Sequence, residues 1–163
     1  MAVGEEMANK LNELLGVCFE MNAHSDNVAY WLRYNNYTEA SKEFHEKYAH
    51  RFPVFADEIT EFMAKVKVRP VRLACPAHID NYAGSEDAFV NVKEQIQIFM
   101  DKIKDAIELA EMNDEVTVKI FLENFLMNIL VYAEQADVWA EKAKLVGDNP
   151  IKFDKYFDDF TII

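Results

Sequence analysis

The chain has 163 residues, with only 4 glycines and 4 prolines, and its formal net charge is −12. This length suits one domain with a single core, and so few turn-forming residues exclude an all-β fold, which needs a turn about every ten residues. The acidic charge repels nucleic acid and anionic membrane, so we expect neither as a partner.

Apolar residues recur at alternating three- and four-residue steps from Met7 to Leu32, which predicts a first helix that ends before Asn35 and Asn36. A second pattern of this kind runs from about residue 38 to residue 66, with Pro53 inside it. Proline removes a helical hydrogen bond and clashes with the preceding turn. We therefore expect a kink or a short break there.

Residues 67–84 contain Pro70, Pro76 and Gly84 and lack a helical pattern, so they predict a long connection. Fully extended, this connection reaches ~60 Å, whereas a helix of about 28 residues is ~42 Å long. It can therefore cross the whole bundle, so that the second and third helices run parallel. Short connections elsewhere make the other neighbours antiparallel. The prediction is an all-α, ferritin-like four-helix bundle with a long crossover between helices 2 and 3.

The third helix should begin near Ser85-Glu86, a candidate cap, and the fourth should follow a turn in which Asp114 is the candidate cap. We expect one domain over residues 1–163, with the bundle at about 5–146 and a tail at 147–163. Because the tail mixes acidic and aromatic residues, it should pack on a bundle face or on a neighbouring molecule.

The first residues, MAVGEEM, lack the basic and apolar segments of a secretory signal. No apolar run approaches the ~20 residues that span a bilayer, so no membrane segment is expected. Cys18 and Cys75 are far apart, and neither belongs to a CxxC motif. These features predict a cytoplasmic location with reduced cysteines.

A di-iron site inside such a bundle uses Glu-x-x-His motifs, and the sequence contains none. The nearest acidic substitutes are Glu20, Glu58, Glu61, Glu94, Glu134 and Asp137. The inward positions of the third and fourth helices are apolar throughout, so we expect the carboxylates there to face solvent.

Three segments resemble the Dps-type miniferritins, and the resemblance covers residues 11–146. Leu11-Asn12-Glu13-Leu14-Leu15 is similar to the start of the family's first helix. Tyr30-Trp31 stands where the family has a histidine followed by an aromatic residue. The segment 113–117 is similar to the Asp-x-x-Thr that opens the family's fourth helix.

The family's iron ligands can be carried over by counting without gaps. Its second histidine falls on Lys42, and its acidic ligands fall on Glu46, Asp57 and Glu61. The resemblance implies a homo-oligomer, in the family a cage of twelve subunits, that binds ferrous iron between subunits, oxidises it as a ferroxidase and stores it. Carboxylates and imidazoles suit ferrous iron. If the helix only kinks at Pro53, the three acidic residues share one stripe.

Both family histidines are replaced, by Tyr30 and Lys42, and a lysine ammonium has no lone pair for a metal. Candidate substitutes are Tyr30 itself, His24, His45 and His50. His24 also fits a hydrogen-bonded core histidine, and the other two fit exposed positions. The alternative function is therefore a non-catalytic structural or binding protein of the same fold, with the aromatic tail from Phe153 to Phe160 as its partner contact.

Overall fold

A computed structural model describes residues 2–147 and 149–163 of the chain. All of its regular elements over these residues are helical. They are, in chain order, α1 (Glu5–Tyr34), α2 (Thr38–Phe44), a π-helical turn (His45–Ala49), α3 (Arg51–Lys65), α4 (Ser85–Met112), α5 (Val116–Val146), α6 (Pro150–Tyr156) and a 3-10 turn (Asp158–Phe160).

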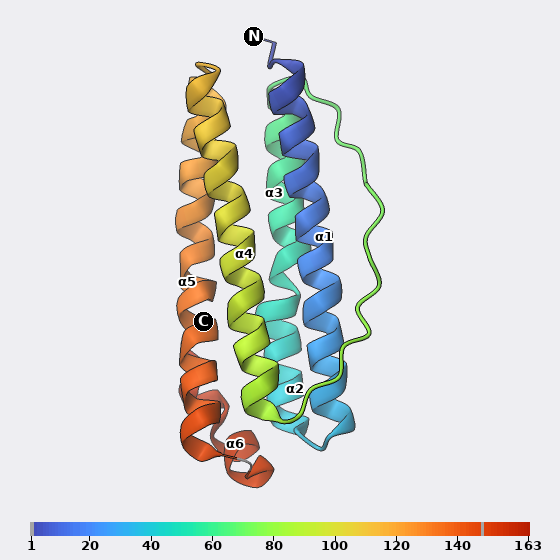
Figure 1. The fold of residues 1–163 in the computed structure, drawn as a ribbon, viewed down its shortest axis with the longest axis vertical. Helices are drawn as coiled ribbons and strands as arrows, with labels where there is room; N and C mark the ends of the chain where they lie inside the picture. The colour runs from blue at the N-terminus through green and yellow to red at the C-terminus, as the bar shows by residue number, and fades with distance from the viewer. Residues whose placement is uncertain (1, 148) are drawn as a thin grey trace.

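The topology follows the predicted order of two antiparallel helix pairs (Figure 1). α2 and α3 form one long segment that runs back along α1, and α5 runs back along α4. The connection between α3 and α4 passes along the outside of α1 from one end of the bundle to the other. α3 and α4 are therefore parallel, and the predicted bundle with a long crossover is confirmed.

Aromatic side chains fill the centre of the bundle. Tyr48, Phe52 and Phe55 project inward from the second helical segment and are buried. The Phe52 ring lies 6.1 Å from Phe99 of α4, and the Phe55 ring lies 5.8 Å from Phe125 of α5. Large rings in edge-to-face contact fill the space between the helices and stabilise their packing.

The break expected near Pro53 is present as a π-helical turn just upstream of it. The N–H of His50 donates to the carbonyl oxygen of His45 at 3.1 Å, a five-residue step. Proline cannot donate to the carbonyl four residues earlier, and its ring crowds that carbonyl. The turn inserts one extra residue, worth about 100° of helical rotation. Glu46 is therefore rotated relative to Asp57, and the spacing that placed both on one stripe does not hold.

Two predicted helix caps are wrong. Ser85 is buried inside the first turn of α4, and its hydroxyl has no partner among the described residues, while the carboxylate of Asp87 accepts from the N–H of Ala83 at 2.9 Å. Asp114 has a φ of 55° in the turn before α5 and makes no cap. The carboxylate of Glu115, the next residue, accepts instead from the N–H of Gly4 at 2.8 Å. In both places, an acidic residue close to the predicted cap accepts a hydrogen bond from a backbone N–H: Asp87 accepts from Ala83, and Glu115 accepts from Gly4.

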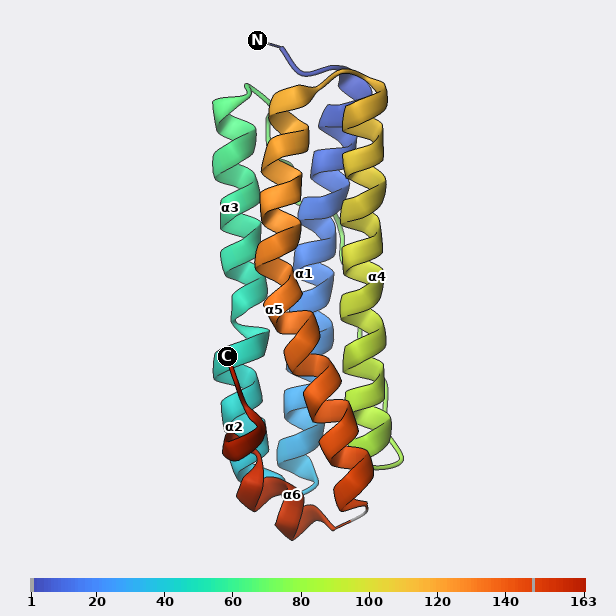
Figure 2. The ribbon, with the colours of Figure 1, turned by 90° about the vertical axis from the view of Figure 1, so that its left-hand side faces the viewer.

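The tail packs on its own bundle, as one of the two expected arrangements (Figure 2). Phe153 and Phe157 are fully buried, with Phe157 stacked on Trp139 at 5.1 Å and Phe153 against Tyr37 at 6.0 Å. These two side chains are therefore not available as a partner contact, and that part of the alternative prediction is wrong.

One described helix, α5, is long and apolar enough by length and composition to cross a bilayer. The expectation that no apolar segment approaches this length is therefore wrong for α5. The core helices of soluble bundles also meet this criterion of length and composition. Its inward side chains are buried. Its exposed apolar side chains are Val116, Ile120, Met127, Leu130, Val131 and Leu145.

Candidate functional site

The acidic side chains considered for a di-iron site do not gather at the centre of the bundle in the described part of the chain. Glu94 and Glu134 are exposed, and Asp137 pairs with Lys93 at 2.6 Å. Glu58 is half-buried, and its pKa is raised, chiefly because burial disfavours its charge. Over residues 2–147 and 149–163, no three His, Cys, Asp or Glu side chains lie together in a metal-binding arrangement. The exposure of Glu94 and Glu134 agrees with the expectation that carboxylates on the third and fourth helices face solvent.

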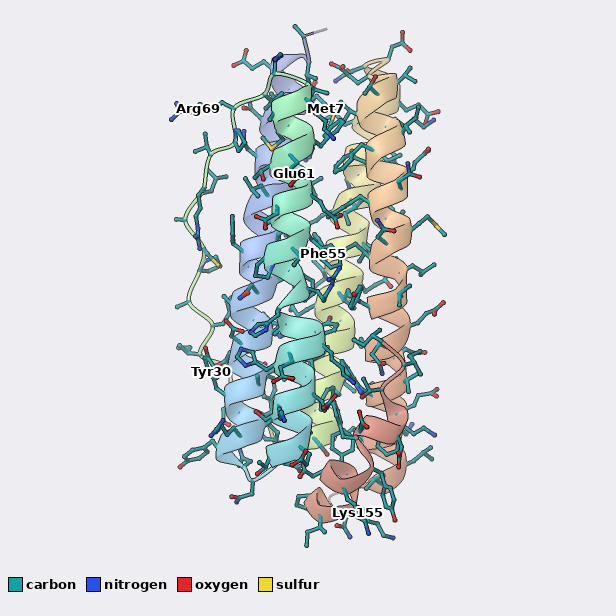
Figure 3. All side chains as sticks on the ribbon, turned by 180° about the vertical axis from the view of Figure 1, so that it is seen from behind. Met7, Tyr30, Phe55, Glu61, Arg69 and Lys155 are labelled. Atoms are coloured by element: carbon teal, nitrogen blue, oxygen red, sulfur yellow. The ribbon has the colours of Figure 1, made fainter. Side chains whose placement is uncertain are left out.

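The three predicted acidic ligands lie on the outside of the molecule. Asp57 and Glu61 are exposed one turn apart on α3, and Glu46 is exposed in the π-helical turn. Figure 3 shows Glu61 on the outer surface of α3, whereas Phe55 of the same helix is buried. Within one subunit the three do not converge, and their meeting across a subunit boundary stays a prediction.

The π-helical turn brings two of the candidate histidines together. The rings of His45 and His50 lie 4.4 Å apart, and Nε2 of His45 lies 3.2 Å from Oδ1 of Asp26 on α1. In an α-helix, residues five apart point about 140° from each other, but a π-turn places them on nearly one face. The sequence prediction assumed α-helical spacing and so did not pair these side chains.

Tyr30 is close to the same cluster but points outward. Its side chain is 61% exposed, and its ring is edge-on to His45 at 6.2 Å (Figure 3). Asp26 lies one turn before Tyr30 on α1, and Asn22 donates to its other carboxylate oxygen at 3.0 Å. The sequence prediction missed Asp26, although its four-residue spacing from Tyr30 marks the same helix face. Lys42 is exposed. The resulting cluster of Asp26, Tyr30, His45 and His50 is called the π-turn cluster below.

His24 lies apart from that cluster, in the core. It is 2% exposed, and its Nε2 lies 2.6 Å from the side-chain oxygen of Asn91 on α4. Burial lowers the pKa of His24, more than the Asn91 hydrogen bond raises it. The core-histidine interpretation therefore fits His24. Its ring is edge-on to His78 of the crossover at 5.8 Å, a residue that the sequence prediction passed over.

Comparison with known proteins rests on structure alone. No family model matches the chain, and no curated protein does. An open-pore ferritin from the hyperthermophilic archaeon Archaeoglobus fulgidus superposes with a TM-score of 0.90 at 15% identity, covering 99% of each chain. The fold is ferritin-like.

Two further ferritins give the same result. A humanized archaeal ferritin matches with a TM-score of 0.89 at 14% identity, covering 99% of each chain. An iron-soaked variant of the ferritin PmFTN matches with a TM-score of 0.81 at 15% identity, covering 86% of this chain and 89% of that one. Coverage of 99% in the archaeal ferritins means that the ferritin-like fold extends over α6 and the C-terminal turn.

Proposed function

We propose that the chain is a cytoplasmic, iron-binding subunit of a ferritin-like homo-oligomer of the Dps type, which oxidises ferrous iron and stores it. The ferritin-like fold supports the proposal, and one of the similar structures is a ferritin soaked in iron. Two free cysteines, one buried and one exposed, fit a reducing compartment.

The position of the metal-suited side chains carries the proposal. Aromatic rings close the interior, whereas Asp57 and Glu61 are exposed on α3 and the π-turn cluster lies between α1 and the π-helical turn. Iron handled by this chain would therefore bind at the outer surface, where a second subunit can complete the ligand set. Asp57 and Glu61 would supply carboxylate oxygens, with Glu46 nearer to the π-turn cluster.

The surface of α5 supports assembly. Exposed apolar side chains that extend along one helix are unfavourable in water and are commonly covered by another protein surface. Ile120 and Met127 are two turns apart on the same face, and both are more than half exposed. With a charge of −12 per subunit, an assembly would also raise the local concentration of cations.

An aerobic iron titration tests this function. Ferrous iron is added to the wild-type chain, to Asp57→Ala/Glu61→Ala, and to Asp101→Ala/Asp105→Ala, and ferric absorbance is followed against buffer. The control pair has the same spacing and charge and is exposed on α4. We expect wild type and control to exceed the buffer rate, and the α3 variant to fall at least about tenfold. Equal rates in both variants would reject the predicted ligands.

The non-catalytic alternative is favoured by Lys42 at a family histidine position and by the aromatic interior. It predicts that the wild-type chain oxidises iron no faster than buffer while remaining assembled. Light scattering on the same sample gives the assembly state, since a twelve-subunit cage has twelve times the 18.9 kDa mass of one chain. A strict monomer would eliminate any site between subunits and, with it, the cage.

A further inference from the structure

The remaining two histidines, His24 and His78, meet where the crossover passes over α1. Their ring centroids lie 5.8 Å apart at an angle of 76°. Nδ1 of His24 and Nε2 of His78 are both buried and have no hydrogen-bond partner in the described part of the chain. Buried ring nitrogens without a partner are unfavourable, so two such nitrogens on neighbouring rings indicate unused binding capacity at this point.

Asn91 fixes the protonation of the His24 ring. The side-chain oxygen of Asn91 lies 2.6 Å from Nε2 of His24 and also accepts from the hydroxyl of Tyr82 at 3.3 Å. Because an amide oxygen only accepts, Nε2 must carry the proton. A neutral ring then has its lone pair on Nδ1, the buried nitrogen without a partner. Metal-binding histidines usually donate their second ring N–H to such an oxygen, which orients the free nitrogen.

Two carboxylates lie near this pair of rings. Glu20 precedes His24 by one turn on the same face of α1, and Asp80 follows His78 by two residues on the crossover. Both are close enough to act electrostatically on His24. In the described structure the two carboxylates do not form one metal-binding group with the rings, so they would have to turn toward a bound ion. Glu20 is half-buried and Asp80 is exposed. Two imidazoles and two carboxylates provide the four donors of a tetrahedral zinc site.

We propose that His24 and His78 bind a divalent transition-metal ion of the zinc type, with Glu20 and Asp80 completing its coordination. The ion would join the crossover to α1, and through Asn91 it would be held against α4. The two imidazole rings already lie near each other in the structure, whereas the two carboxylates would move to reach the ion. This inference is independent of the proposed iron chemistry, which uses α3 and the π-turn cluster.

Cobalt is a suitable probe because tetrahedral Co²⁺ absorbs visible light and Zn²⁺ displaces it. The wild-type chain, His24→Gln, His78→Gln and the control His45→Gln/His50→Gln are titrated with Co²⁺ alone. The control removes the only other histidines of the chain. We expect the tetrahedral Co²⁺ absorption from the wild-type and control chains, and at least about tenfold weaker binding at this site in each of the other two variants.

Two results would overturn the proposal. One is no Co²⁺ binding by the wild-type chain, which would leave water as the partner of both nitrogens. The other is binding that survives in His24→Gln and His78→Gln but is lost in the control, which would move the metal to the π-turn cluster. His78 lies outside every helix, so His78→Gln tests the site even if His24→Gln unfolds. Zn²⁺ should also raise the melting temperature of the wild type and not that of His78→Gln.

Discussion

The carboxylate of Asp154, on α6, accepts a hydrogen bond from the backbone N–H of Ala40 at 2.8 Å, in the first turn of α2. The same carboxylate accepts from the N–H of Glu39 at 3.2 Å. Tyr37, which precedes α2, makes no side-chain cap hydrogen bond in the described structure. The C-terminal tail therefore supplies the cap that α2 lacks, from more than a hundred residues away.

Asp154→Ala should lower the free energy of unfolding by about 1 kcal/mol, the usual effect of losing a helix cap. Urea unfolding followed by circular dichroism measures the change. Asp159→Ala is the matched control, because Asp159 is an exposed acid of the same tail. An equal loss in both variants would show that general charge, and not the cap, is responsible.

Tyr48→Phe should stabilise the chain. The Tyr48 hydroxyl is fully buried among Phe44, Phe52 and Trp139 and has no hydrogen-bond partner in the described structure. Removing such a hydroxyl without changing the ring should raise the free energy of unfolding by about 1 kcal/mol. Urea midpoints of the two chains give the difference. A loss of stability would reveal a buried partner, such as an ordered water.

Alkaline pH should weaken the attachment of the crossover through Tyr82. Burial raises the pKa of Tyr82 to about 12, above the ordinary value of ~10. Between these values the unfolded chain releases a proton that the folded chain keeps. The stability that Tyr82 contributes is therefore complete below pH ~10 and is lost as the pH rises through 12.

When the pH is raised from 9 to 11, the free energy of unfolding should consequently fall by about 1 kcal/mol less in Tyr82→Phe than in the wild type. Urea unfolding at both pH values measures this difference. Tyr34→Phe is the control, since it removes a tyrosine hydroxyl from a side chain that is 86% exposed. Identical slopes for Tyr82→Phe and wild type would contradict the raised pKa.

The outer surface of α5 should be required for assembly. Met127→Glu places a charge on an apolar position that is 62% exposed. The variant should therefore form an oligomer with fewer subunits than the wild type. Light scattering after size exclusion measures the mass. Gln97→Glu, exposed on α4, adds the same charge elsewhere and should leave the mass unchanged. Wild-type mass in Met127→Glu would remove α5 from the interface.

The sequence by itself determined the four long helical segments of the bundle and their order. The three- and four-residue spacing of apolar side chains identifies a buried face wherever it continues, as from Phe89 to Ala110. The length of the connection at 67–84 then decides which helices run parallel, because a chain that long can span the bundle. The spacing of apolar side chains is a local property and the reach of the connection depends only on its length, so the sequence is sufficient to predict both.

Only the tertiary structure decided the contacts between distant segments. Whether the helix near Pro53 kinks or forms a π-turn depends on competition between local hydrogen bonds and core packing, and the π-turn is what places His45 beside His50. The cap from Asp154 to α2 and the meeting of His24 with His78 join residues that no spacing rule relates. Side chains far apart in the chain are brought together by the packing of the whole core, which a local pattern does not encode.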